Sequence, residues 1–389
     1  MDLLEYQGKQ LFAAAGVAVP SGEPAADVEA AVAAAGRIGY PCVIKAQVLI
    51  GGRGKAGGIK VAKDEDEARA HADAILGMDI YGPRREGPFR VHEVWVESAS
   101  DIDKEYYASI ILDRSAKKPL VILSRMGGMN IEEVAETDPD ALVRRHVEPA
   151  EGLTVDAARQ MAIDAQLDDD VVDASAEILT KIYEAFNAND ATLIEINPLI
   201  VTASREVVAL DAKVTIDNSA LFRHPELAET TSATDDLDEQ EKMAKERGLT
   251  YVSLDGDIGI LGNGAGLCMS TLDVVANAGG KPANFLDAGG GSKADAIVDA
   301  LEVISSNPNV KAILFNIFGG ITRCDEVAKG IIEAYSRVDM DVPLVVRLDG
   351  TNSEEGLRLL DEAQLEGLHQ EKTMLGAADR VVALAGGAA

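Results

Sequence analysis

Residues 283–322 read ANFLDAGGGSKADAIVDALEVISSNPNVKAILFNIFGGIT. In this stretch, apolar runs at residues 283–286 and 312–317 each lead into a glycine-rich loop, and a helix-like segment follows each loop. Short buried strands that pass through glycine loops into helices are typical of a parallel, doubly wound sheet. We therefore predict such a sheet, and we expect ligands outside the carboxyl ends of its strands, where the loops gather.

The same pattern extends outward from this stretch. An apolar run at residues 258–261 precedes the loop NGAG, another at 344–348 precedes DGTNSEEG, and a closing strand is predicted at 381–384. The repetition begins only after residues 229–248, a polar and charged segment that we interpret as a linker or an exposed helix. The chain is therefore predicted to divide near this segment.

Helices and strands are mixed irregularly in the first half. The predicted helices cover residues 3–15, 27–38, 64–76, 155–167 and 171–187. The predicted strands cover residues 42–47, 59–62, 91–97, 105–112 and 120–123, and residues 192–202 and 206–216 are predicted to form a hairpin. The resulting fold class is α/β, with a mixed α+β domain followed by a doubly wound, parallel-sheet domain.

The 389-residue chain is strongly acidic. It has 36 Lys and Arg residues against 66 Asp and Glu residues, which gives a formal net charge of −30. This charge disfavours nonspecific binding to nucleic acids and to anionic membranes, because both are polyanions. We hypothesise that the acidic surface suits a salt-rich cytoplasm, where salt screens its self-repulsion.

Other features of the composition indicate a cytoplasmic protein. The chain has 3 Cys residues without CxxC spacing, which suits a reducing compartment. Its N-terminus lacks the basic and apolar regions of a signal peptide, and no apolar run reaches membrane-spanning length. We therefore expect a soluble protein of the cytoplasm, without a membrane partner.

The segment GGRGKAGG, at residues 51–58, lies between two predicted strands. Its glycines permit a close backbone approach to a ligand, and Arg53 and Lys55 place two cations among them. Lys45, on the preceding strand, can reach the same ligand as a point charge. The pattern predicts a hairpin that covers phosphates, with a flexible exposed hairpin as the alternative; it is not a Walker A motif, because no Ser or Thr follows Lys55.

The predicted hairpin at residues 192–216 carries a candidate magnesium site. Its turn centres near Ser204, and because Asn197 and Asp211 each lie seven residues from that centre, antiparallel pairing places them opposite one another. Glu195 shares a face with Asn197, since side chains alternate along a strand. Oxygen ligands of this kind suit Mg²⁺, and a solvated polar face is the alternative.

Three further polar residues, Glu97, Ser100 and Glu105, flank the end of a predicted strand. Carboxylates in this position can accept hydrogen bonds from ribose hydroxyls or from an adenine amino group. Taken alone, this pattern fits a solvated loop better than a binding site.

The glycine loops of the second half offer one more candidate site. The loop that begins at Gly262 does not fit GxGxxG from either possible start, so NAD binding is not predicted. Residues 319–322 lead into a predicted helix at residues 325–335, whose N-terminus can hold a phosphate or a carboxylate. Ordinary strand-to-helix turn chemistry is the alternative for this loop. The 5 His residues share no metal-ligand spacing and lie outside the glycine loops, so we identify no phosphoryl carrier.

Taken together, the motifs resemble those of the succinate–CoA ligase beta-subunit family over nearly the whole chain. The matching segments are LLEYQGKQLFAAAGV, GGRGKAGG, LIEINPL, ALFRHPEL, NGAGLCMSTLD, PANFLDAGGG, NIFGGITRCD and VPLVVRLDGTN. The resemblance implies an ATP-grasp nucleotide-binding domain at residues 1–228, a linker at 229–244 and a flavodoxin-like CoA-ligase domain at 245–389. It also implies a reversible ligation of succinate and CoA driven by ATP, with ADP as product and one Mg²⁺ per beta subunit. The implied partner is an alpha subunit that carries a phosphohistidine and the CoA site, in a heterodimer or a heterotetramer.

The resemblance assigns roles to individual residues. The implied nucleotide contacts are Lys45, Gly52, Arg53, Gly54, Glu97, Ser100 and Glu105. The implied magnesium ligands are Asn197 and Asp211, and Glu195 is implied to contact the partner's histidine. The residues implied to line the site of the acid or acyl phosphate are Asn263, Gly320, Ile321 and Thr322.

Two positions depart from the family pattern. Leu49 stands where the family commonly has His, which puts one polar contact near the nucleotide in doubt, and Ser100 replaces a more usual Thr. Pro20 offers no side-chain group to a guanine edge, which favours adenine. Malate in place of succinate, an ATP-grasp ligase that joins a carboxylate to an amine, and a non-catalytic nucleotide-sensing subunit remain alternatives.

Overall fold

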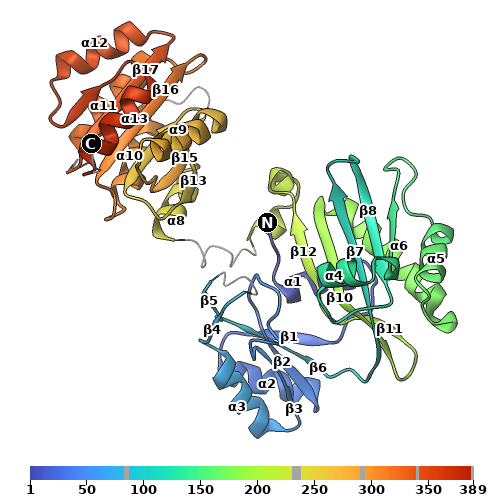
Figure 1. The fold of residues 1–389 in the computed structure, drawn as a ribbon. Helices are drawn as coiled ribbons and strands as arrows, with labels where there is room; N and C mark the ends of the chain where they lie inside the picture. Colours follow the sequence, from blue (N-terminus) through green and yellow to red (C-terminus); the bar gives the residue numbers. More distant parts are fainter. Residues whose placement is uncertain (83–86, 230–237, 290–293, 339–340, 387–389) are drawn as a thin grey trace. The chain divides into compact units, whose positions relative to one another are not determined.

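The structure is a computed structural model that describes residues 1–82, 87–229, 238–289, 294–338 and 341–386 (Figure 1). Its internal contacts divide the chain into two units, Met1–Ala233 and Thr234–Ala389. The division falls inside the predicted linker, of which residues 230–237 lie outside the described part. The loop predicted after residue 286 is also described only up to residue 289.

The first unit begins with α1 (Glu5–Ala14) and contains a small antiparallel sheet in the order β1-β6-β2-β3. Its strands are β1 (Gly22–Ala25), β2 (Cys42–Ala46), β3 (Ile59–Ala62) and β6 (Val94–Ser98). The helices α2 (Val28–Ile38) and α3 (Glu65–Ile75) bury a stripe of alanines against this sheet. Each helix starts at a capping aspartate, because Asp27 accepts a hydrogen bond from the Ala30 amide and Asp64 accepts one from the Glu67 amide.

A second, larger sheet of the first unit has the order β11-β10-β7-β8-β9, and β12 also pairs with β10. Its strands are β7 (Ile102–Asp113), β8 (Lys118–Ser124), β9 (Leu142–His146), β10 (Ala191–Thr202), β11 (Val207–Ala209) and β12 (Lys213–Ile216). The helices α5 (Val155–Asp164) and α6 (Val172–Ala188) share one apolar core with this sheet. The remaining short elements of the unit are β4 (Asp79–Ile80), β5 (Phe89–Arg90), α4 (Ile131–Thr137), α7 (Pro225–Glu229) and the 3-10 turns at Pro139–Ala141, Asp169–Val171 and Asn218–Arg223.

The predicted hairpin is present, but its second strand is broken in two. β10 pairs with β11 through Leu199 and Ala209, and it pairs with β12 through Glu195 and Lys213. The two ladders keep a single register, so residues 197 and 211 stand opposite one another in the gap between β11 and β12. This gap leaves Asp211 outside the regular ladder.

The second unit contains a six-stranded sheet in the order β13-β15-β14-β16-β17-β18. Its strands are β13 (Thr250–Ser253), β14 (Ile258–Gly262), β15 (Asn284–Asp287), β16 (Ala312–Gly319), β17 (Leu344–Gly350) and β18 (Leu368–Gln370). All neighbours are parallel except β13, which lies antiparallel to β15 at the edge. Its helices are α8 (Glu239–Glu246), α9 (Ala265–Asn277), α10 (Ala294–Ser305), α11 (Cys324–Arg337), α12 (Ser353–Ala363) and α13 (Met374–Leu384).

Two apolar cores, one on each face of this sheet, show that it is doubly wound. Alternate residues of β16 belong to different cores: Ile313 and Phe315 pack with α10 and α11, while Leu314 packs with α9 and α13. Figure 1 shows helices on both sides of the strands. The predicted fold class is therefore confirmed.

The prediction of a closing strand at residues 381–384 is wrong. These residues form the last turn of α13, which begins where the Thr373 side chain accepts a hydrogen bond from the Gly376 amide. The side chains of Ala377, Val381 and Val382 are buried, a helical spacing that a short apolar run does not reveal by itself. The last strand is β18, in which the sequence is not apolar throughout.

Candidate functional site

Four of the predicted nucleotide and magnesium residues lie together in the first unit. Lys45 extends from β2, Arg53 from the glycine loop after β2, Glu97 from β6, and Asp211 from the gap between β11 and β12. The structure therefore joins side chains from both sheets of the unit at one site.

A carboxylate that was not predicted lies at the centre of this site. Glu5 lies at the start of α1 and forms two ion pairs. Its Oε1 lies 2.8 Å from Lys45 Nζ, and its Oε2 lies 2.7 Å from Arg53 Nη1. Lys45 also pairs with Glu97 Oε1 at 2.7 Å. Each carboxylate oxygen of Glu5 thus contacts a different one of the two cations that are predicted to bind phosphates.

Arg53 links this centre to the predicted magnesium site. Its Nη2 donates to both carboxylate oxygens of Asp211, at 2.9 and 3.1 Å, and its Nη1 also donates to the carbonyl oxygen of Ala46. Lys45 Nζ donates to the carbonyl oxygen of Leu210 at 3.0 Å. Both cations are therefore fixed against the chain segment that carries Asp211.

Lys9 is the second member that the sequence reasoning missed. Its Nζ lies 2.8 Å from Glu5 Oε1, and it also pairs with Glu97, which accepts a further hydrogen bond from Trp95 Nε1 at 2.8 Å. Glu5 and Lys9 lie four residues apart, and Phe12 follows on the same helical face with no exposed surface. In the sequence, the signal that could have identified Glu5 and Lys9 is the apolar Phe12 on the same helical face as this charged pair.

These six side chains, which we call the ion-pair network, carry three positive and three negative charges. The network comprises Glu5, Lys9, Lys45, Arg53, Glu97 and Asp211. Five of these residues are at most 6% exposed, and only the Asp211 side chain, at 31%, reaches solvent to a larger extent. Buried charges are tolerated when they are paired in this way.

The pairing keeps both signs of charge at neutral pH. Burial alone would raise the pKa of Glu5, but Arg53, Lys45 and Lys9 hold it well below its usual value. Burial would likewise lower the pKa of Lys45, and the carboxylates of Glu5, Glu97 and Asp211 raise it instead. Glu5 therefore keeps its negative charge and Lys45 its positive charge at neutral pH, whereas burial, and then the charge of Glu5, raise the pKa of Asp211.

Asn197 and Asp211 provide the oxygen atoms that a magnesium ion prefers. Asn197 Oδ1 accepts one hydrogen bond, from the Gly128 amide at 2.8 Å, and Nδ2 donates to the Met129 carbonyl oxygen, so the amide is oriented and keeps one lone pair on Oδ1. The donor set fits a magnesium ion that takes its other ligands from water and phosphate. Within the described residues, His, Cys, Asp and Glu side chains form no group of three that could hold a metal.

Glu105 lies beside Gly128, the residue whose amide bonds Asn197. Gly128 has φ +71°, which favours glycine, and a Cβ atom built there would come within 2.2 Å of Glu105 Oε2, so the carboxylate lies directly against this residue. Glu195 accepts a hydrogen bond from Tyr107 Oη at 2.9 Å. Burial, and then the Glu195 charge, raise the pKa of Tyr107, so its hydroxyl remains a donor.

The other predicted nucleotide residues, Gly52, Gly54 and Ser100, belong to the loops that follow β2 and β6. Gly52 and Gly54 are exposed on either side of the buried Arg53, and Gly52 has φ +81°. Ser100 is half-buried in the loop after β6. The glycine loop therefore turns its arginine inward and its backbone outward.

The second unit brings its predicted residues together at the carboxyl ends of β14 and β16. Asn263 Nδ2 donates to the Phe318 carbonyl oxygen at 2.8 Å, and Asn263 Oδ1 accepts from the Phe318 amide at 2.9 Å. Gly320 is exposed, Ile321 is 88% exposed and Thr322 is buried. The first turn of α11 carries two acidic residues, Asp325 and Glu326. Asp325 pairs with Arg323 at 2.9 Å, and this contact lowers the pKa of Asp325 to about 2.

Comparison with known proteins places both units in families. The ATP-grasp domain family matches residues 2–201, and the CoA-ligase family matches residues 261–381. The protein named succinate–CoA ligase (ADP-forming) subunit beta from Rubrobacter xylanophilus is 52% identical over 385 residues, which cover 99% of each chain. The protein of the same name from Natronomonas pharaonis is 51% identical over 383 residues, which cover 98% of each chain.

This chain belongs to the succinate–CoA ligase beta-subunit family. Among solved structures, ATP citrate lyase from Methanothrix soehngenii has a similar fold, with a TM-score of 0.75 at 19% identity over 99% of this chain and 98% of that chain. The family resemblance predicted from the motifs is confirmed.

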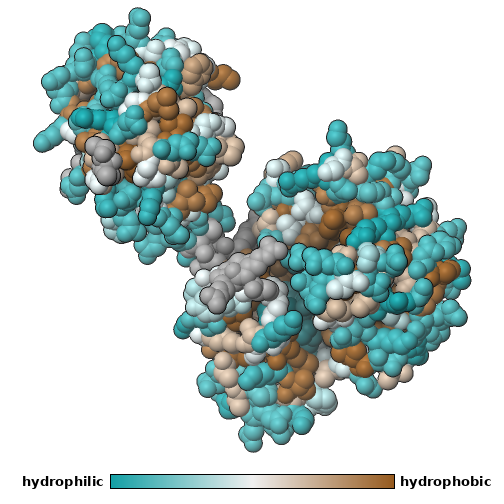
Figure 2. Space-filling view, in the orientation of Figure 1, coloured by the Kyte–Doolittle hydropathy of each residue, from teal (hydrophilic) through white to brown (hydrophobic). Residues whose placement is uncertain are grey.

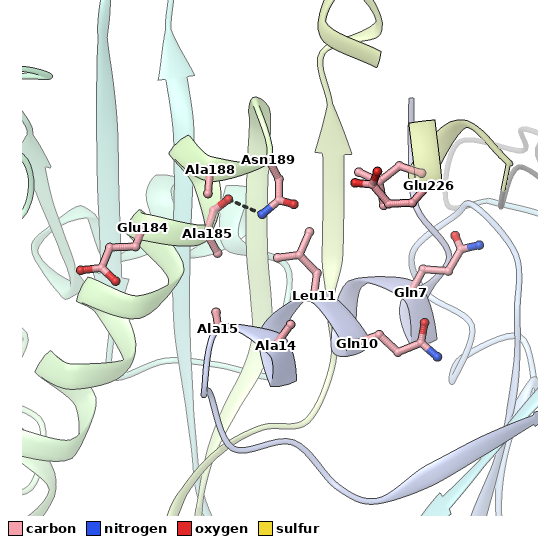
Figure 3. Close-up of a pocket in the computed structure, with 11 residues that line it drawn as sticks. Gln7, Gln10, Leu11, Ala14, Ala15, Glu184, Ala185, Ala188, Asn189 and Glu226 are labelled. Atoms are coloured by element: carbon pink, nitrogen blue, oxygen red, sulfur yellow. Dashed lines mark hydrogen bonds between the residues drawn. The ribbon is translucent and has the colours of Figure 1, made fainter. Parts of the chain in front are cut away.

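A pocket of about 430 Å³ lies on the side of α1 that faces away from the ion-pair network (Figure 3). It is lined by Gln7, Gln10, Leu11, Ala14, Ala15, Glu184, Ala185, Ala188, Asn189, Glu226 and Leu227. None of the predicted site residues lines it, so α1 presents Glu5 and Lys9 to the ion-pair network and a different face to this pocket. No helix of the described chain is long and apolar enough to cross a membrane.

Proposed function

We propose that this chain is the nucleotide-binding subunit of an ADP-forming succinate–CoA ligase. The proposed reaction converts succinate, CoA and ATP reversibly into succinyl-CoA, ADP and phosphate. The observation that supports it best is the convergence of Lys45, Arg53, Glu97 and Asp211 in a chain that shares half of its residues with beta subunits of that name.

Phosphoryl transfer is the step that the first unit would catalyse. Lys45 and Arg53 would stabilise the charge on the transferring phosphoryl group, and Gly52 and Gly54 would allow the loop backbone to approach the phosphates. Glu97, Ser100 and Glu105 would contact the remainder of the nucleotide. Glu195, oriented by Tyr107, would hold the partner's imidazole as that ring takes charge.

Asn197 and Asp211 would hold Mg²⁺ beside the nucleotide. When bound, the ion would neutralise charge on the phosphates. Because Asp211 is bonded to Arg53 in this structure, we propose that metal and nucleotide arrive together and exchange these contacts. The arginine would then turn from a carboxylate to a phosphate.

The second unit would take part in the later chemistry. Asn263, Gly320, Ile321 and Thr322 would line the site where the acid or acyl phosphate meets the phosphohistidine of an alpha subunit. The exposed Ile321 would be covered when this partner binds. We place the complex in the cytoplasm, because all three cysteines are unpaired and buried.

The test is nucleotide-driven phosphorylation of the alpha subunit in the assembled complex. We expect Lys45→Ala and Asp211→Ala each to abolish it, while copurification of the two subunits persists. Lys118→Ala is the matched control, because Lys118 pairs with Glu148 at the surface of the same unit. Retained phosphorylation in either site variant would refute the proposed roles.

The same complex distinguishes the alternative functions. Thioester formation with succinate, compared with malate, identifies the acid, and ADP compared with GDP identifies the nucleotide. Nucleotide binding without thioester formation from any acid would indicate a sensor instead of an enzyme.

A further inference from the structure

The mechanism proposed above leaves one central group of the ion-pair network without a role. Glu5 is 3% exposed and contacts Lys45 at 2.8 Å, Arg53 at 2.7 Å and Lys9 at 2.8 Å. It is the one carboxylate of the network that touches both proposed phosphate-binding cations, because Glu97 pairs with Lys45 and Asp211 with Arg53. A buried carboxylate that bridges two cations fixes the positions of both.

The other two carboxylates of the network are expected to give up these contacts. Glu97 is proposed to bind the nucleotide, and Asp211 is proposed to bind Mg²⁺. If both take up their ligands, Lys45 and Arg53 lose Glu97 and Asp211 as partners and retain Glu5. Besides the backbone carbonyl oxygens of Leu210 and Ala46, Glu5 would then be the carboxylate of the network that still orients the two cations.

The packing of α1 supports a fixed position for Glu5. A Cβ atom at Gly8 would lie 3.0 Å from Ala212 Cβ, so the helix lies directly against the segment that follows Asp211. The Leu3 amide also donates to the Val214 carbonyl oxygen at 2.9 Å. The start of α1 is thereby held against the segment that follows Asp211 and against β12.

We infer that Glu5 is a positioning residue for phosphoryl transfer, which sets Lys45 and Arg53 at the geometry that the transferring phosphoryl group requires. This inference rests on the nucleotide-binding role proposed above for the two cations. Lys9 balances the charge of Glu5 and completes its orientation.

The experiment measures phosphorylation of the alpha subunit by the complex, with kcat and the KM for nucleotide determined separately. In Glu5→Gln the bridge is lost and the network gains one net positive charge. We expect kcat to fall about 10- to 100-fold, because small displacements of catalytic groups have effects of this size. We expect KM to stay equal or to fall, because the more positive site attracts the anion.

A double variant separates geometry from charge. Glu5→Gln with Lys9→Met restores an equal number of positive and negative charges but does not restore the bridge. We expect its KM to return to the wild-type value while kcat stays at least about 10-fold low. Glu5→Asp, which retains the charge on a shorter side chain, is expected to give a wild-type KM and an intermediate kcat, and it serves if Glu5→Gln does not fold.

The matched control is Glu177→Gln. Glu177 pairs with Lys181 at 2.7 Å with the same four-residue spacing, but at 65% exposure on α6. It should leave both constants unchanged.

Three results would overturn the inference: a wild-type kcat in Glu5→Gln, recovery of kcat in the double variant, or a KM that rises while kcat holds. A wild-type complex that phosphorylates nothing would instead refute the proposed function.

Discussion

Tyr106 and Tyr107 are adjacent on β7, equally buried at 3% exposure, and turned to opposite faces of the sheet. Tyr107 donates to Glu195 at 2.9 Å, whereas the hydroxyl of Tyr106 accepts from the Asp168 amide at 3.4 Å. The Tyr107 hydroxyl orients Glu195, the carboxylate proposed to contact the partner's histidine. Tyr107→Phe should therefore slow phosphorylation of the alpha subunit and cost about 1 kcal/mol of stability. Enzyme kinetics and urea unfolding measure the two effects. Tyr106→Phe is the control, and an equal loss of rate in both variants would contradict the role of Tyr107.

The lowered pKa of Glu5 makes a second prediction for a single residue. Its usual value is 4.5, and the native value lies well below this. The unfolded chain therefore binds a proton at Glu5 first, so the stability that the Glu5 carboxylate contributes is complete above the usual value and declines as the pH falls toward the native pKa. We expect the difference in unfolding free energy between wild type and Glu5→Gln to shrink as the pH falls below 4.5. Urea titrations at several pH values measure it, and a constant difference would count against the ion pair.

Residue identity alone predicted part of this site. Lys45 and Arg53 stand out because cations beside glycines suggest phosphates, and Asn197 and Asp211 because strand pairing is countable from the turn. Glu5 and Lys9 do not stand out in the same way, since a charged pair at four-residue spacing normally lies on the solvent face of a helix. The apolar Phe12 on the same helical face hints at their burial, and the packing of α1 against both sheets establishes it.

At the scale of secondary-structure elements, α13 shows which predictions fail and why. The glycine loops marked the strand ends of the second unit, because such loops must follow buried parallel strands. The four apolar residues at 381–384 fit a strand as well as a helix, and the glycines that follow them do not distinguish the two. Packing within the second unit favours the helix over the strand. Val381 packs with Ile258 and Leu314 on the sheet face that α9 also covers.

This packing predicts a difference within one helix. Val381 has no exposed surface, whereas Leu375 is 68% exposed. Val381→Ala should cost about 2 kcal/mol of stability, because it leaves a cavity under the sheet, and Leu375→Ala should cost close to nothing. Chemical denaturation of the two variants measures this, and similar losses in both would show that α13 is not seated as described.

At the scale of the whole molecule, the dominant property is the net charge of −30. Hydrophilic residues cover most of the visible face of each unit (Figure 2). Self-repulsion of this charge opposes the folded state and is screened by ions, so we expect the unfolding free energy to rise from about 0.1 M to about 1 M KCl. A series in sucrose, which stabilises without screening, is the control. Stability that does not change with KCl would refute the habitat hypothesis.

The equal numbers of positive and negative charges in the ion-pair network determine which ions can bind there. Chloride or inorganic phosphate meets no surplus cation there, since each positive group already has a carboxylate at contact distance. To displace those carboxylates, an incoming anion must supply several oxygens at once and bring its own divalent counter-ion for Asp211. A site of this kind would not bind the small anions of a concentrated brine, and it would bind only a polyphosphate that arrives already complexed with metal.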